Sequence, residues 1–160
     1  MKRRLAWLTV SLCAGVLAAG SAAWAGPEAS GAALWKHLKA ENYTSWKMWP
    51  GKSALYPGTE PHGVLLTTYV NGAALGAIEG KKGTMPAGAI VVKENYMPDK
   101  TLAAVTVMYK VQGYNPAGGD WFWAKYAPDG KVDEEGKEGM CLGCHSRVAD
   151  NDYLFIGPLK

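Results

Sequence analysis

Two cysteines and a histidine near the end of the chain form the strongest chemical motif of this sequence. Residues 141–145 read Cys-Leu-Gly-Cys-His, the C-x-x-C-H pattern that attaches a c-type haem. The thiols of Cys141 and Cys144 would add across the two haem vinyl groups as thioethers. His145 would then bind the iron as an axial ligand. The motif therefore predicts one haem c per chain, bound through Cys141, Cys144 and His145, with His145 as the iron ligand.

Two other uses of these cysteines need to be weighed. Structural zinc takes four ligands from Cys and His, and the motif supplies three. The remaining candidates are Cys13, His37 and His62, and they form no second C-x-x-C or H-x-x-x-H pattern. A redox disulfide of the thioredoxin kind accompanies a βαβ unit, whereas this motif lies close to the end of the chain. Haem attachment is the interpretation that the motif favours, with zinc and a disulfide as alternatives.

The first residues are typical of an export signal. Residues 2–4 are Lys-Arg-Arg, residues 5–20 are almost continuously apolar, and Ala23-Trp24-Ala25 is a small-x-small cleavage site. Covalent haem attachment takes place outside the bacterial cytoplasm, so the signal and the haem motif agree. We predict a signal peptide over residues 1–25, a haem domain over residues 26–160 and a location in the periplasm.

Charge and composition exclude some classes of partner. The whole chain carries a formal net charge of +3, which is the charge of the three basic residues at 2–4, so the mature chain is neutral. Nucleic-acid binding calls for a basic face, and no such excess is present. No segment after the signal is apolar enough to span a membrane. The remaining length suits one domain with its own core.

The residue pattern in the middle of the chain mainly predicts strands. Ser30 predicts a cap for a helix over 31–41, and Asn71 predicts one for a short helix over 73–79. An ordered loop is expected over 43–63, which is rich in proline, glycine and aromatic residues, and a solvated loop or helix start over the acidic residues 133–138. Runs of β-branched and aromatic residues, separated by turns, predict four strands: 64–70, 89–96, 102–111 and 121–127. The expected fold is α+β: a curved antiparallel sheet with short helices, holding the haem between the sheet and the C-terminal segment.

The order of these features resembles the cytochrome P460 family, which includes the β-sheet cytochromes c′. The resemblance covers about residues 30–160 and rests on more than the haem motif. It includes AIVVKENY at 89–96, VTVMYK at 105–110, DWFWAKYAPDG at 120–130 and NDYLF at 151–155. It implies a homodimeric periplasmic protein with one haem, a small nitrogen-oxide ligand or substrate, and a soluble periplasmic electron-transfer partner.

The resemblance also implies a candidate for a second covalent link to the haem. In the hydroxylamine-oxidising members, a lysine nitrogen is bonded to a meso carbon of the porphyrin, and Lys93 matches that lysine best. Strand alternation places Lys93 on the same face as Ala89 and Val91, from which it could enter an apolar pocket. An exposed lysine on an edge strand is the alternative. Glu94 would lie on the opposite face.

The open face of the iron decides between functions. The resemblance aligns Leu66, flanked by Leu65, Thr67 and Thr68, with a distal arginine of the enzymes, a departure that favours nitric-oxide binding. His62 could reach the mouth of a pocket as a catalytic base, or lie on the surface. A methionine ligand, with Met48, Met85 and Met97 as candidates, would instead make an electron carrier. Three hypotheses follow: redox chemistry on hydroxylamine or nitric oxide, nitric-oxide binding without catalysis, and Met-ligated electron transfer.

Overall fold

The computed structural model describes residues 26–160, so the predicted signal peptide and Cys13 lie outside the described residues. Three short α-helices accompany seven strands. The helices are α1 (Gly31–Ala40), α2 (Gly72–Glu79) and α3 (Gly139–His145), and single 3₁₀ segments occur at Tyr43–Ser45, Pro116–Gly118 and Ser146–Asn151. The strands are β1 (Lys47–Met48), β2 (Tyr56–Pro57), β3 (Leu65–Val70), β4 (Ile90–Tyr96), β5 (Leu102–Lys110), β6 (Trp121–Tyr126) and β7 (Val132–Gly136).

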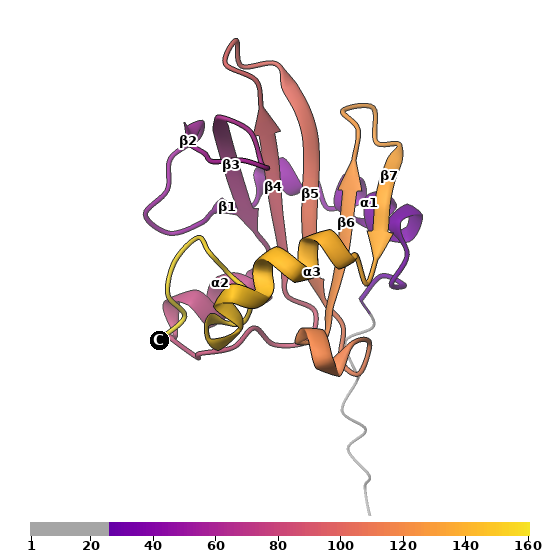
Figure 1. Cartoon of the computed structure of the whole chain (residues 1–160), viewed down its shortest axis with the longest axis vertical. Helices are drawn as coiled ribbons and strands as arrows, with labels where there is room; N and C mark the ends of the chain where they lie inside the picture. Colours follow the sequence, from indigo (N-terminus) through magenta and orange to yellow (C-terminus); the bar gives the residue numbers. More distant parts are fainter. Residues whose placement is uncertain (1–25) are drawn as a thin grey trace, which may run out of the picture.

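All seven strands belong to one sheet. The order is β1-β3-β4-β5-β6-β7, each neighbouring pair is antiparallel, and β2 also pairs with β3. Short turns join β4 to β5 and β6 to β7, as antiparallel neighbours allow. Helix α1 lies behind the sheet, whereas α3 crosses in front of it, with α2 and the end of the chain below (Figure 1). The predicted α+β class with an antiparallel sheet is confirmed.

The two faces of the sheet carry two separate apolar clusters because neighbouring strand residues point to opposite sides. The rear cluster packs under α1 and includes Leu34, Leu38, Ile90, Val92, Val105, Val107, Tyr109, Phe122 and Tyr126. The front cluster packs under α2 and the end of the chain and includes Val70, Ala74, Ala77, Val91, Met108, Trp121, Trp123, Leu154 and Leu159. The front of the sheet therefore faces the haem motif.

Both predicted helix caps are present. The Ser30 hydroxyl accepts a hydrogen bond from the Ala33 amide, and the Asn71 side chain accepts one from the Ala74 amide. Asn71 also accepts from the Ile90 amide and donates to the Gly88 carbonyl, at 3.1 and 2.8 Å. The cap of α2 thus also ties this helix to the start of β4.

One expectation about local structure was wrong, and another was incomplete. The acidic stretch 133–138 was expected to be a solvated loop or helix start, but most of it forms β7, which pairs with β6. Glu134 lies opposite Lys125 and forms an ion pair with it at 3.6 Å. The expected loop over 43–63 contains the two-residue strands β1 and β2. Cross-strand partners stabilise these segments, and local propensity does not report such partners.

No helix in residues 26–160 is long and apolar enough to cross a membrane.

Candidate haem site

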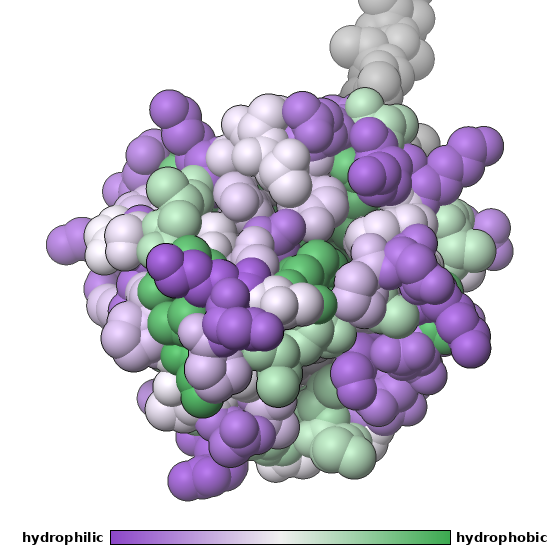
Figure 2. Space-filling model, turned by 90° about the horizontal axis from the view of Figure 1, so that it is seen from above, coloured by the Kyte–Doolittle hydropathy of each residue, from purple (hydrophilic) through white to green (hydrophobic). Residues whose placement is uncertain are grey.

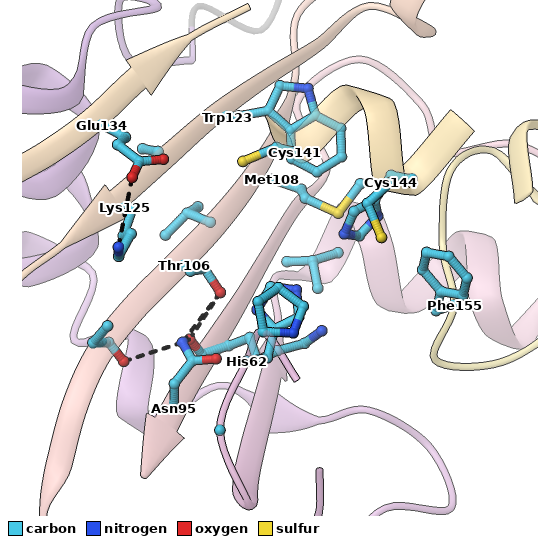
Figure 3. Close-up of a pocket in the computed structure, with 18 of the residues that line it drawn as sticks. His62, Asn95, Thr106, Met108, Trp123, Lys125, Glu134, Cys141, Cys144 and Phe155 are labelled. Atoms are coloured by element: carbon cyan, nitrogen blue, oxygen red, sulfur yellow. Dashed lines mark hydrogen bonds and ion pairs between the residues drawn. The ribbon is translucent and has the colours of Figure 1, made fainter. Parts of the chain in front are cut away.

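A cavity of about 360 Å³ lies between the front of the sheet and the haem motif. Its floor is made of two rows of side chains set by the register of β4, β5 and β6. The apolar row consists of Val91, Met108 and Trp123, and the polar row consists of Lys93, Thr106 and Lys125. A volume of this size is typical of pockets for small molecules and cofactors. Figure 3 shows this pocket from within.

Helix α3 directs the haem motif into this cavity. Cys141 and Cys144 are three residues apart, and Cys141 and His145 are four apart, so that all three share one face of a helix. All three line the cavity. His145 is buried and the cysteines are half-buried and unpaired. The structure therefore brings together the three predicted attachment residues on one side of the cavity and Lys93 on another.

A backbone carbonyl fixes the orientation of the His145 ring. The Nδ1 atom of His145 lies 2.6 Å from the Tyr153 carbonyl oxygen. Because a carbonyl can only accept, Nδ1 carries the proton of the neutral ring, and Nε2 keeps its lone pair for a metal. Metal-binding histidines usually have such an outer partner. Burial, followed by the charge of Lys93, lowers the pKa of His145, while the bond to Tyr153 acts in the opposite direction. Both observations support a neutral, metal-binding imidazole.

The segment after the motif holds that carbonyl in place. Asp152 and Tyr153 have positive φ angles of 53° and 66°, and they reverse the chain. The Asn151 side chain donates to the carbonyls of Leu154 and Gly157 and accepts from the Leu159 amide. Sequence reasoning noticed residues 151–155 only as part of a resemblance. Their role is to present the Tyr153 carbonyl to His145.

A buried ion pair anchors the same segment to the sheet. The Asp152 carboxylate accepts hydrogen bonds from Lys110 Nζ at 2.6 Å and from the Met85 amide at 2.7 Å. The Trp121 indole donates to the Asp152 carbonyl at 3.0 Å, and Lys110 Nζ lies 4.6 Å from the centre of the Trp121 ring. Lys110, a weaker candidate than Lys93 for the haem link, is thus occupied by a structural role.

Lys93 enters the cavity from β4. It lies on the face shared with Val91 and Asn95, as strand alternation predicts, and burial lowers its pKa to about 8. Lys93 therefore loses its proton more readily than an ordinary lysine, although most of it is still protonated at pH 7. The neighbouring Glu94 lies on the opposite face, where it is buried and accepts hydrogen bonds from the hydroxyls of Tyr43 and Tyr96 at 2.9 and 2.5 Å.

His62 is a loop residue, but its side chain lies in the cavity close to His145. It lines the cavity, and its ring centre lies 6.1 Å from that of His145, with the ring planes at 84°. Burial, followed by the charges of Lys93 and His145, lowers the pKa of His62 to about 4, and its interaction with Asn95 partly offsets this. By contrast, Leu65, Leu66, Thr67 and Thr68 are absent from the cavity lining described for residues 26–160.

Neither alternative for the cysteines, a structural zinc site or a redox disulfide, is supported by this geometry. Residues 26–160 hold no group of three or more His, Cys, Asp and Glu side chains placed to bind a metal ion together. Burial, with Glu134 and Glu138 nearby, raises the pKa of Cys141 to about 11. Redox-active cysteines instead have a lowered pKa that makes them thiolates.

Two buried polar atoms in the cavity wall lack a partner within the protein. They are Oδ1 of Asn95 and Nε1 of Trp123, and both residues line the cavity. Unsatisfied buried groups are costly. An acceptor on a bound cofactor could pair with the Trp123 N–H, whereas Asn95 Oδ1 needs a donor. A neutral imidazole, the two cysteine thiols and a floor with one apolar row together fit a haem.

A sequence model of the cytochrome P460 family matches residues 40–156. The chain belongs to the cytochrome P460 family. The matched region contains both cysteines, His145 and Lys93. Family membership makes this protein a c-type haem cytochrome. No curated protein sequence gives a significant match to the chain.

Proposed function

We propose that this protein is an exported mono-haem cytochrome that performs redox chemistry on a small nitrogen species, hydroxylamine or nitric oxide. The observation that carries the proposal is the convergence of Lys93 and the haem motif on one largely apolar cavity. Bound haem iron supplies one-electron redox chemistry and an axial position for a small ligand. The residues of the chain then determine how the haem is held and what reaches it.

Cys141, Cys144 and His145 hold the haem in this proposal. Each thiol adds across one vinyl group, so that the sulfur forms a new bond to carbon while the thiol proton ends on the neighbouring carbon. No electrons are exchanged with an outside reagent in this addition. The burial that keeps Cys141 protonated suits a thiol that reacts once and then remains as a thioether.

Lys93 is the proposed site of the link to the porphyrin that marks the enzymes of the family. The link replaces one N–H and one C–H bond by an N–C bond, which releases two protons and two electrons, so a two-electron oxidant such as peroxide must accept them. A neutral amine is the nucleophilic form of lysine. The lowered pKa of Lys93 and its apolar neighbours Val91 and Met108 support this role.

The optical spectrum of the purified protein tests the Lys93 link. We expect a strongly red-shifted Soret band in the parent protein and an ordinary haem c spectrum in Lys93→Ala. Lys82→Ala is the matched control, because Lys82 is exposed and lies outside the cavity lining. A red-shifted parent spectrum that persists in Lys93→Ala would exclude Lys93 as the linked residue.

Nitric-oxide binding without catalysis is the second candidate function, and the apolar row Val91, Met108 and Trp123 favours it. Hydroxylamine-dependent reduction of a soluble one-electron acceptor separates the two functions. An enzyme reduces the acceptor in proportion to the hydroxylamine consumed. A gas-binding protein leaves both hydroxylamine and acceptor unchanged, and it forms a nitric-oxide complex only when nitric oxide is added.

The proposal extends to the surface around the cavity, where a partner could dock. The exposed side chains Met97, Met140 and Phe155 line the cavity, with exposed fractions of 52, 73 and 51%. Seen from above, the molecule has apolar surface near its centre, bordered by hydrophilic side chains (Figure 2). Apolar surface at the cavity supports a docking site for a soluble electron-transfer partner. We also propose a periplasmic location, on the basis of the predicted signal, and a homodimer, on the basis of the family resemblance.

A further inference from the structure

We propose that His62 is a second axial ligand of the haem iron, placed opposite His145, which a small ligand must displace to bind. This inference rests on the haem site of the proposed function but not on its substrate. The face of the iron that was expected to be open or bound by methionine is then closed by an imidazole from the loop before β3.

Tight backbone packing positions the loop that carries His62. The Gly58 amide donates to the Val64 carbonyl at 2.8 Å and the His62 amide donates to the Thr59 carbonyl at 3.1 Å. A Cβ atom on Gly58 would lie 2.3 Å from the Gly63 carbonyl oxygen. Gly63 has a φ angle of +90° and lies against the Tyr96 backbone. The two ends of the loop are thus closed against each other and against β4, which directs His62 into the cavity.

The spacing of the two imidazoles matches that of two ligands on one metal ion. Metal–nitrogen bonds to histidine are about 2.0–2.1 Å long, so that two imidazoles on opposite sides of one ion have ring centres about 6 Å apart. The ring centres of His62 and His145 are 6.1 Å apart. Nδ1 of His145 donates to the Tyr153 carbonyl, so Nε2 of His145 is left to bind the ion. The side chain of His62 interacts with that of Asn95. One ring nitrogen is enough for that interaction, so the other can face the ion.

Asn95 can accept a hydrogen bond from His62, as the Tyr153 carbonyl does from His145. The amide nitrogen of Asn95 lies 3.0–3.2 Å from the Lys93 carbonyl, the Ala104 carbonyl and the Thr106 hydroxyl. These bonds fix the orientation of the amide, and its Oδ1 is buried without a hydrogen-bond partner. Figure 3 shows the Asn95 nitrogen on the Thr106 side, with His62 beyond the other side of the amide. Ligating histidines commonly donate their second N–H to such an oxygen.

The methionines are placed less well for this role. Met48 and Met85 are absent from the described cavity lining. Met97 and Met140 line the cavity but are among the most exposed apolar side chains, and Met108 lies in the sheet floor between Val91 and Trp123. Neutral imidazole is also the commonest metal ligand in proteins.

A displaceable internal ligand would change how the site works. Binding of a small ligand would compete with His62, so its apparent affinity would be reduced by the fraction of molecules in which His62 is bound. His62 lies in the loop between β2 and β3, outside the residues that pair in the sheet, so its ring can swing away from the iron while the strand pairing stays intact.

Electron paramagnetic resonance and optical spectra of the ferric holoprotein test this inference. We expect the parent protein to give a low-spin spectrum with two nitrogen axial ligands. His62→Ala should lose that signal and give a high-spin spectrum, and added imidazole should restore the low-spin form. His37→Ala is the matched control, because His37 lies on α1 outside this cavity, and it should leave the spectrum unchanged. His62→Met, which keeps a side chain able to bind iron, should introduce a sulfur-to-iron charge-transfer band and serves if His62→Ala does not fold.

The outcomes separate this inference from the proposed function. A high-spin parent spectrum, or a low-spin signal that His62→Ala leaves unchanged, would overturn the assignment of His62. A high-spin parent that binds nitric oxide would overturn the ligation while leaving the proposed function in place. A low-spin parent whose His62→Ala variant binds neither nitric oxide nor hydroxylamine would overturn the proposed function while leaving the ligation in place.

Discussion

The buried pair of Lys110 and Asp152 should control the stability of the segment that orients His145. The exposed fractions of the two side chains are 12 and 6%, and their charged atoms lie 2.6 Å apart. Coulomb's law gives about 6 kcal/mol for this separation at an effective dielectric constant of about 20. The cost of removing both charges from water offsets part of this attraction. Asp152→Asn removes the negative charge and leaves Lys110 buried without a counter-charge.

We expect Asp152→Asn to lower the free energy of unfolding by about 3 kcal/mol, at the lower end of the range for breaking a buried pair. The lower end applies because the asparagine oxygen can still accept from the Met85 amide, which now lies 2.7 Å from the carboxylate. Asparagine also tolerates the positive φ angle of 53° at this position. The substitution therefore changes the charge and little else.

Urea unfolding of the holoprotein, followed by far-ultraviolet circular dichroism, measures this loss. A change of about 3 kcal/mol moves the midpoint by about 1–3 M urea for a domain of this size. Asp150→Asn is the control, because Asp150 is exposed in the same segment and should change stability by about 0.5 kcal/mol or less. If Asp152→Asn were no more destabilising than Asp150→Asn, the pair would not anchor the segment.

Two further predictions concern the side of the sheet opposite the cavity. Tyr43→Phe removes one of the two hydroxyls that donate to the buried Glu94 carboxylate, and we expect a loss of about 1.5–3 kcal/mol in urea unfolding; an unchanged midpoint would mean that water replaces the hydroxyl. Gly130→Ala should lower stability by more than about 1 kcal/mol, because Gly130 has a φ angle of +89° and a Cβ there would lie 2.2 Å from Nε1 of Trp35. Gly76→Ala, in α2 with nothing within 4 Å of the added carbon, should instead be neutral or stabilising, and equal losses in both variants would contradict this reasoning.

The sequence predicted those elements whose signals are local. The caps at Ser30 and Asn71 and the β-branched runs of β3 to β6 each lie within a few residues of the structure that they specify. Strand β7 was missed because its acidic residues have low β-propensity. Its exposed Glu135 and half-buried Glu134 are held by the neighbouring β6 and by α1, whose first amide, that of Gly31, donates to Glu135. Such partners are distant in sequence.

The candidate attachment residues stand out in the sequence, but most of their surroundings do not. Cys141, Cys144 and His145 form a contiguous motif, whereas the Tyr153 carbonyl has no side-chain signature. The contribution of His62 depends on a loop whose shape is set by glycine contacts with β4. Asn95 could have been found from the sequence, because it is two residues after Lys93 on the same strand face. The resemblance pointed to Leu66, a buried residue outside the described cavity lining.

Covalent haem attachment is the claim on which the rest of this account depends, and intact-protein mass spectrometry after acid–acetone extraction measures it most directly. We expect the extracted protein to keep its colour and to weigh one haem more than the polypeptide, and the double variant Cys141→Ala/Cys144→Ala to lose both properties. Extraction of all the pigment from the parent protein, or a mass equal to the polypeptide alone, would contradict the account.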